Sequence, residues 1–160
     1  MNDAKELYDP LLEKVRDITD SSSGREDNLL AICTLLEERV SHYDWVGFYL
    51  VDPKSEKELV LGPYVGEPTE HERIPFGRGI CGQAAERGET FVVQDTSGEA
   101  NYLSCSSKVQ AEIVVPFFRD GKVVGELDID SHTISPFTEE ERKFLEEVSQ
   151  MVSNLFESHT

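Results

Sequence analysis

Residues 111–131 have the sequence AEIVVPFFRDGKVVGELDIDS, which predicts two strands joined by a tight turn. Apolar residues occupy both halves, and Asp120-Gly121 lies between them, a strong short-range signal for a β-hairpin. A hairpin pairs its strands antiparallel, so this stretch predicts an antiparallel sheet.

Acidic residues alternate with apolar ones in the second half of this hairpin. Glu126, Asp128 and Asp130 fall on one face of the strand, while Leu127 and Ile129 fall on the other. Half-exposed strands often have this pattern. Two aspartates on one face repel each other, however, and a cationic group of a ligand between them would remove that cost.

A second hairpin is predicted earlier, where WVGFYLVD at residues 45–52 and KELVLGPYVG at 57–66 flank a turn. Alternation puts Trp45 and Tyr49 on one face with Gly47 between them. Two interpretations stay open. Either a helix covers this aromatic face, or the face is the floor of a ligand site in which the glycine leaves room and the rings flank a small molecule.

Three helices are expected around these strands. One spans residues 3–19, a second begins with Asp27 as its N-cap and runs to about His42, and the last follows Thr138. Glu141, three residues after Thr138, predicts a capping box at the start of the last helix. The apolar stripes of these helices can pack against a sheet or against a second copy of the chain.

Cys81 lies in the glycine-rich turn GRGICG at residues 77–82, which predicts the start of a short helix that Gly88 ends. The turn matches the dinucleotide-binding pattern GxGxxG, but that motif needs a parallel strand-helix-strand unit, and hairpin-spaced strands make one unlikely. Near the positive end of a helix, the thiol is expected to ionise more easily than a free cysteine.

Cys105 lies in a long polar loop, DTSGEANYLSCSSKVQ at residues 95–110. Loops of this length are usually functional or disordered. A structural cysteine would need apolar neighbours, whereas serines and a lysine surround this one. We therefore expect Cys105 to be a functional thiol.

Composition narrows the classes of partner. A chain of 160 residues predicts one domain, and 15 basic against 32 acidic residues give a net charge of −17, which repels nucleic acid and anionic membranes. The N-terminus lacks the features of a signal peptide, which predicts a cytoplasmic protein. The three cysteines have no zinc-finger spacing, so no metal site is expected, and Cys33 in the apolar stripe of a helix is expected to be a core thiol.

The order of these elements resembles a GAF domain, and several blocks are similar to the free methionine-(R)-sulfoxide reductases. The resemblance covers residues 27–155 and implies an α+β fold built on an antiparallel sheet of about six strands. The N-terminal and C-terminal helices are expected on one side of this sheet. Loops and short helices are expected to cover a ligand pocket on the other side. It implies a single GAF domain over residues 1–160, divided into an N-terminal helix and linker at 1–25 and a core at 26–158. The blocks are WVGFY at 45–49, ELVLGPYVG at 58–66, RIPFGRGICG at 73–82, EIVVPFFRDGKVVGELDIDS at 112–131 and PFTEEER at 136–142.

The resemblance also implies roles for two cysteines. Cys105, seven residues before Glu112, matches the cysteine that attacks the sulfoxide, and Cys81 matches the cysteine that then forms a disulfide with it. Many members carry a third cysteine ten residues before the turn cysteine, where this chain has His71. The chain thus resembles the two-cysteine form of the family, with Cys81 as the resolving thiol.

The substrate residues of the family match Trp45, Tyr49, Glu112, Asp128 and Asp130. Carboxylates can bind the ammonium group that distinguishes a free amino acid from a peptide, and the aromatic rings can enclose the thioether methyl. Glu112 is our first choice for the acid that protonates the leaving sulfoxide oxygen, with Asp130 second.

The expected activity is therefore the thiol-dependent reduction of free methionine-(R)-sulfoxide, with thioredoxin as reductant, no metal or organic cofactor, and a homodimer as a further expectation. The alternative is a GAF domain without catalytic activity that binds a small molecule or senses redox state. A disulfide formed on reaction with the substrate would distinguish the enzyme from a module that only binds a ligand. A redox sensor would form the same disulfide with peroxide but would show no preference for the R epimer.

Overall fold

The computed structural model describes residues 3–102 and 108–156. In these residues, helices pack against a six-stranded sheet. The strands are ordered β3-β2-β1-β6-β5-β4 and every pair is antiparallel, which confirms the predicted α+β class. The elements are α1 (Asp3–Thr19), α2 (Arg25–Arg39), β1 (Trp45–Asp52), β2 (Ser55–Val65), β3 (Arg73–Pro75), α3 (Gly79–Arg87), β4 (Phe91–Val93), the 3₁₀ turn η1 (Thr96–Gly98), β5 (Ala111–Arg119), β6 (Lys122–Ser131) and α4 (Glu139–Ser153).

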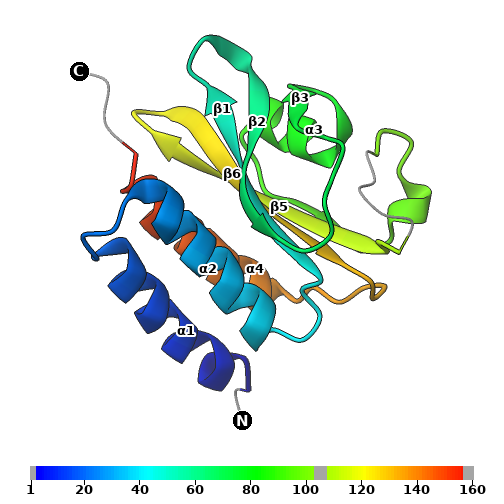
Figure 1. The fold of residues 1–160 in the computed structure, drawn as a ribbon. Helices are drawn as coiled ribbons and strands as arrows, with labels where there is room; N and C mark the ends of the chain where they lie inside the picture. Colours follow the sequence, from blue (N-terminus) through cyan, green and yellow to red (C-terminus); the bar gives the residue numbers. More distant parts are fainter. Residues whose placement is uncertain (1–2, 103–107, 157–160) are drawn as a thin grey trace.

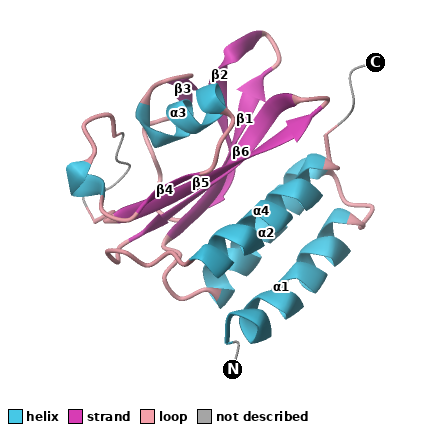
Figure 2. Ribbon diagram, turned by 180° about the vertical axis from the view of Figure 1, so that it is seen from behind, coloured by secondary structure: helices cyan, strands magenta, loops and turns pink. Residues whose placement is uncertain are grey.

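Three of the helices cover one face of the sheet. Figures 1 and 2 show α1, α2 and α4 together on one side, while the short helix α3 lies on the other. Residues that alternate along the strands, such as Phe48 on β1 and Leu127 and Ile129 on β6, belong to the large core under the three helices. A smaller cluster that includes Trp45 and Tyr49 lies under α3. The two faces of β1 therefore separate as the alternation predicted.

The hairpin of β5 and β6 forms as predicted. Asp120 and Gly121 have φ angles of 53° and 78°, so both turn residues are left-handed, as a type I′ turn requires. The register pairs Glu112 with Asp130 and Ile113 with Ile129. This register fixes which acidic side chains meet on the face below α3.

Capping explains where the helices begin. Thr138 Oγ1 accepts from the Glu141 amide at 3.1 Å, and Glu141 Oε1 accepts from the Thr138 amide at 3.2 Å, which confirms the predicted capping box of α4. The predicted second helix forms as α2, but its predicted bounds were wrong, because the helix begins at Arg25 rather than after Asp27 and ends at Arg39. Asp27 instead lies in its first turn, where a negative charge stabilises the helix dipole.

The second helix also contains the third thiol. Cys33 is fully buried, its Sγ lies 3.6 Å from the Pro63 carbonyl oxygen, and burial raises the pKa of the thiol. These contacts confirm that Cys33 is a core residue.

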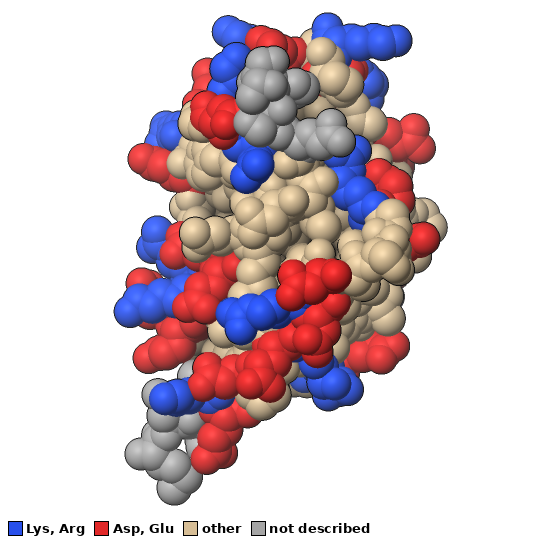
Figure 3. All heavy atoms as spheres, turned by 90° about the vertical axis from the view of Figure 1, so that its left-hand side faces the viewer, with Lys and Arg blue, Asp and Glu red and all other residues tan. Residues whose placement is uncertain are grey.

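The surface carries the excess of acidic residues. In the face shown in Figure 3, aspartate and glutamate side chains gather in the lower half. None of the helices in the described part of the chain is long and apolar enough to cross a membrane.

Candidate active site

The candidate site lies on the face of the sheet under α3, where three strands bring acidic and aromatic residues together. Strand β6 is the middle strand, and its Asp130 is paired with Trp45 on β1 and with Glu112 on β5. Asp128 is paired with Gly47 on β1. Strand pairing thus brings residues as far apart in the chain as Trp45 and Asp130 into one small area of the sheet.

Glycines allow α3 to approach this area closely. Gly77 and Gly79 have φ angles of 90° and 65°, which disfavour other residues, and a Cβ on Gly82 would lie 2.6 Å from the Pro75 carbonyl oxygen. The tight turn follows β3, which is antiparallel to β2, so the dinucleotide-binding interpretation of GRGICG is excluded by its context. The turn instead places Cys81 over the carboxylates.

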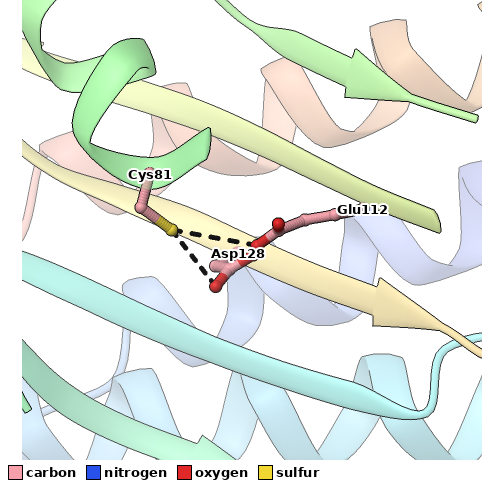
Figure 4. A group of neighbouring side chains, drawn as sticks. All are labelled: Cys81, Glu112 and Asp128. Carbon is pink, nitrogen blue, oxygen red and sulfur yellow. Dashed lines mark hydrogen bonds between the residues drawn. The ribbon is translucent and has the colours of Figure 1, made fainter. Parts of the chain in front are cut away.

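Cys81 points from α3 directly at two acidic side chains (Figure 4). Its Sγ donates to Asp128 Oδ2 at 3.2 Å and makes a longer contact of 3.9 Å with Glu112 Oε2. The thiol is 5% exposed, Glu112 4% and Asp128 5%. The structure therefore encloses one thiol and two carboxyl groups with little access for water.

This enclosure reverses the predicted acidity of Cys81. Burial, and then the negative charges of Asp128, Glu126 and Glu112, raise the pKa of the thiol well above its ordinary value. The prediction that the thiol ionises easily was wrong, because the dipole at the start of a helix is a small effect beside desolvation and three nearby carboxyl groups.

The carboxyl groups raise one another's pKa for the same reason. Burial, followed by repulsion from Asp128 and Asp130, raises the pKa of Glu112 well above that of a free glutamate. Burial also raises the pKa of Asp128, although hydrogen bonds from Glu112 and Cys81 oppose this. Glu126, two positions before Asp128, is fully buried, and burial and the Asp128 charge raise its pKa well above the usual range. Such groups keep their protons to higher pH than free carboxyl groups do.

The two aromatic residues predicted for the site lie side by side next to the acidic cluster. The ring centroids of Trp45 and Tyr49 are 6.4 Å apart with 28° between the planes, and Trp45 also stacks on Tyr64 at 5.3 Å. Trp45 Nε1 donates to the Glu67 carbonyl oxygen at 3.0 Å, and the Tyr49 hydroxyl donates to the His71 carbonyl oxygen at 2.8 Å. The polar atoms of both rings are therefore satisfied by carbonyl oxygens, and the Trp45 ring is stacked between its aromatic neighbours.

The structure combines the two interpretations of this aromatic face. Trp45 and Tyr49 line a cavity, and α3 packs over the same cluster. Gly47 does not leave room for a ligand directly, because a Cβ there would lie 2.4 Å from Trp45 Cη2. The space above this glycine is filled by the Trp45 ring, so the expectation about its role is corrected.

The cavity contains about 350 Å³ of space, part of it open to solvent. Six of the seven predicted site residues line it, namely Trp45, Tyr49, Cys81, Glu112, Asp128 and Asp130. The seventh, Cys105, lies outside the described residues.

Other lining residues were not among the predicted site residues. They come from the loop after β2, from β3 and from the start of α3, and are Thr69, His71, Ile74, Arg78, Gly79 and Ile80. Thr69, His71 and Arg78 lie in irregular segments, where no periodicity indicates the direction of a side chain. His71 stands where many members of the family have a third cysteine, and its place in the cavity wall is a finding of the structure.

The loop that carries Cys105 is anchored beside Cys81. Asn101 Oδ1 accepts from the Gly79 amide at 2.8 Å, and Asn101 Nδ2 donates to the Gly77 carbonyl oxygen at 2.8 Å. At the other end of the loop, the Gln110 amide donates to the Ser131 carbonyl oxygen at 2.8 Å. Both described ends of the loop therefore meet the elements that build the site.

The cluster is also a set of potential metal ligands. Cys81, Glu112 and Asp128 each offer one atom, and these atoms lie within 4.8 Å of one another. A thiolate and carboxylates are donors that transition metals accept. The spacing of these residues in the chain resembles no known zinc motif, so the sequence did not indicate the cluster.

Comparison with known proteins identifies similar chains across this whole region. The family model of the GAF domain matches residues 3–155. GAF domain-containing protein A of Dictyostelium discoideum is 35% identical over 150 residues, which are 94% of this chain and 92% of that protein. The free methionine-R-sulfoxide reductase of Escherichia coli is 36% identical over 114 residues, 71% of this chain and 67% of that protein.

A solved structure agrees with these relatives. The X-ray structure of free methionine-R-sulfoxide reductase from Neisseria meningitidis in complex with its substrate has a TM-score of 0.90 and 38% sequence identity. The match covers 98% of this chain and 91% of that one.

Proposed function

The chain belongs to the GAF domain family, and from this premise and the geometry of the site we propose that it reduces free methionine-(R)-sulfoxide to methionine. One observation supports the proposal most strongly. Cys81 is held 3.2 Å from Asp128 in the wall of a cavity that Trp45, Tyr49, Glu112 and Asp130 also line. A thiol, acidic groups and aromatic rings are the parts that this reduction needs.

Binding of a free amino acid follows from the paired aspartates. Asp128 and Asp130 project from alternate positions of β6 into the cavity and can together bind the substrate ammonium group. Methionine within a peptide lacks that group, so the same aspartates would be left without a partner. The pair thus favours the free amino acid over the peptide.

The aromatic residues complete the recognition. Trp45 and Tyr49 can enclose the thioether methyl, whose sulfur gains positive charge as the sulfoxide oxygen is protonated. Glu112 is suited to supply that proton, because its raised pKa keeps the carboxyl group protonated at higher pH than a free glutamate.

The thiol steps involve Cys105 and Cys81 in order. Cys105 attacks the sulfoxide sulfur, the sulfur-oxygen bond breaks, methionine leaves, and the oxygen stays on Cys105 as a sulfenic acid. Cys81 then attacks Cys105, the hydroxyl leaves as water with the Cys81 proton, and a disulfide forms. The raised pKa of Cys81 suits a thiol that stays protonated until this second step. Thioredoxin would return the disulfide to two thiols.

This scheme requires no metal or organic cofactor, since the electrons come from the two thiols. A cytoplasmic location, where thioredoxin is available, and a homodimer belong to the same proposal. In this proposal, a single GAF domain over residues 1–160 carries out the reaction.

Intact mass tests the disulfide step. Reduced protein treated with a single portion of free methionine-(R)-sulfoxide should lose two hydrogen masses, and peptide mapping should place the bond between Cys81 and Cys105. Cys105→Ser should abolish the mass change, while Cys81→Ser should trap the sulfenic acid on Cys105. Unchanged mass in the parent protein would instead favour a GAF domain that binds its ligand without reducing it.

A further inference from the structure

We propose that the reduced protein binds one thiophilic divalent cation, such as Zn²⁺, through Cys81, Glu112 and Asp128, and that this cation excludes the substrate. The three ligand atoms are already within 4.8 Å of one another. The binding site itself is independent of the proposed function. Only the exclusion of substrate depends on it.

The two sulfur–oxygen distances are close to those of a tetrahedral site. With metal-sulfur and metal-oxygen bonds of about 2.3 Å and 2.0 Å, tetrahedral ligands lie about 3.5 Å apart. Cys81 Sγ lies 3.2 Å from Asp128 Oδ2 and 3.9 Å from Glu112 Oε2, on either side of that value (Figure 4). The two carboxyl oxygens lie within 4.8 Å of each other, so a cation could bind all three atoms if the side chains close around it.

Burial supplies a second reason for a cation. Glu112 and Asp128 are each about 95% buried, and Asp128 Oδ1 has no hydrogen-bond partner among residues 3–102 and 108–156. Both residues line the cavity. An unpartnered buried carboxyl oxygen is costly. A cation held by both oxygens of Asp128 would give Oδ1 a partner, and its charge would remove the repulsion within the cluster.

The charges around the cluster also favour a cation. Glu126 and Asp130 add two more buried acidic groups. Among the described residues that line the cavity, the basic ones are Arg78 and His71. The positive start of α3 is partly neutralised, because the Gly79 amide donates to Asn101 Oδ1.

The thiol determines which cations bind. Zn²⁺ and Cd²⁺ accept thiolate ligands readily, whereas Mg²⁺ and Ca²⁺ prefer sites made only of oxygen. The cation takes the place of the Cys81 proton, which is released to solvent, so the step needs no oxidant or reductant.

Occupation of this site would block the proposed reaction at two points. Cys81 could not attack the sulfenic acid while bound to the metal, and Asp128 could not bind the substrate ammonium group. Metal and substrate should therefore compete for the same protein.

The test uses Cd²⁺, whose bond to a thiolate gives an ultraviolet charge-transfer band. Reduced full-length Cys105→Ser protein, freed of metal with a chelator, should bind one Cd²⁺ per chain and show the band. Adding Cys81→Ser should abolish the band, and Asp128→Asn or Glu112→Gln should weaken binding at least about 10-fold. Cys33→Ala, which changes a core thiol under the opposite face, should leave the band unchanged. Zn²⁺ should displace Cd²⁺, and millimolar Mg²⁺ or Ca²⁺ should not.

A Cd²⁺ band that persists after Cys81→Ser, or an affinity that none of the three substitutions changes, would overturn the proposal. The proposed function fails separately, through absent turnover in metal-free protein. If turnover is present, Zn²⁺ should raise the apparent KM for methionine sulfoxide, and an excess of chelator should restore it.

Discussion

Replacement of Glu126 by methionine should stabilise the protein. Glu126 is fully buried on β6, paired with Tyr49 on β1 and Pro116 on β5. Within residues 3–102 and 108–156, neither oxygen of its carboxyl group has a hydrogen-bond partner. Burial and the charge of Asp128 raise its pKa, which indicates that the ionised form is strongly disfavoured in the folded state. The folded state therefore bears a cost that the unfolded state lacks.

The size of the effect follows from this burial. A buried polar group without a partner costs about 1–3 kcal/mol, and methionine has nearly the shape of glutamate without its polar atoms. We expect Glu126→Met to raise the free energy of unfolding by that amount. For a chain of this length the gain corresponds to a rise in Tm of roughly 2–12 °C, at about 2–4 °C per kcal/mol.

Urea and thermal unfolding of the reduced protein, in buffer that contains a chelator, measure this gain. Glu126→Gln, which removes the charge and keeps a polar group, should give a smaller increase than Glu126→Met. Glu56→Met on the exposed side of β2 is the matched control and should change stability by less than about 0.5 kcal/mol. If Glu126→Met is no more stable than the parent protein, the carboxyl group must have a favourable interaction in the folded state, and the predicted cost of its burial is wrong.

Three other substitutions test separate parts of the account. Gly47→Ala should weaken substrate binding, measured by calorimetry, because the added Cβ would lie 2.4 Å from the Trp45 ring. Gly24→Ala is the control and should leave binding unchanged, because the space around Gly24 is open. Thr138→Ala should lower the free energy of unfolding by about 1 kcal/mol through loss of the cap of α4, and an unchanged urea midpoint would contradict this. Burial raises the pKa of Tyr8 to about 12, so the folded state keeps a proton that the unfolded state loses from about pH 10, and stability falls over that interval. Tyr8→Phe should lose less stability than the parent between these pH values, and equal losses would count against a buried neutral phenol.

The features of the sheet that could be predicted from the sequence are those that neighbouring residues determine. Alternation alone placed Asp128 and Asp130 on one face, and the Asp120-Gly121 pair located the turn, because side-chain direction and turn geometry are local properties. Strand order is not local. Trp45 on β1 lies against Asp130 on β6 because the two hairpins pair through these strands. The residues alone did not indicate this pairing, and the resemblance implied only that both residues belong to the substrate site.

The chemistry of the site was harder to predict for the same reason. The acidity of Cys81 was inferred from its own helix, but the groups that dominate it are Asp128, Glu126 and Glu112, which reach it only in the folded chain. The start of α2 was misplaced because its N-cap is Gly24, which has no side chain to make a capping hydrogen bond, whereas the prediction looked for a capping side chain. Cys105 lies outside the described residues, so its role stays a prediction.

The most direct measurement of the central claim is turnover of methionine sulfoxide in four forms, free and peptide-bound, each as the R and S epimer, with thioredoxin regeneration. The account predicts reduction of the free R epimer, little reduction of the other three, and loss of activity in Cys105→Ser. Full activity in Cys105→Ser, or equal turnover of peptide-bound and free substrate, would contradict it.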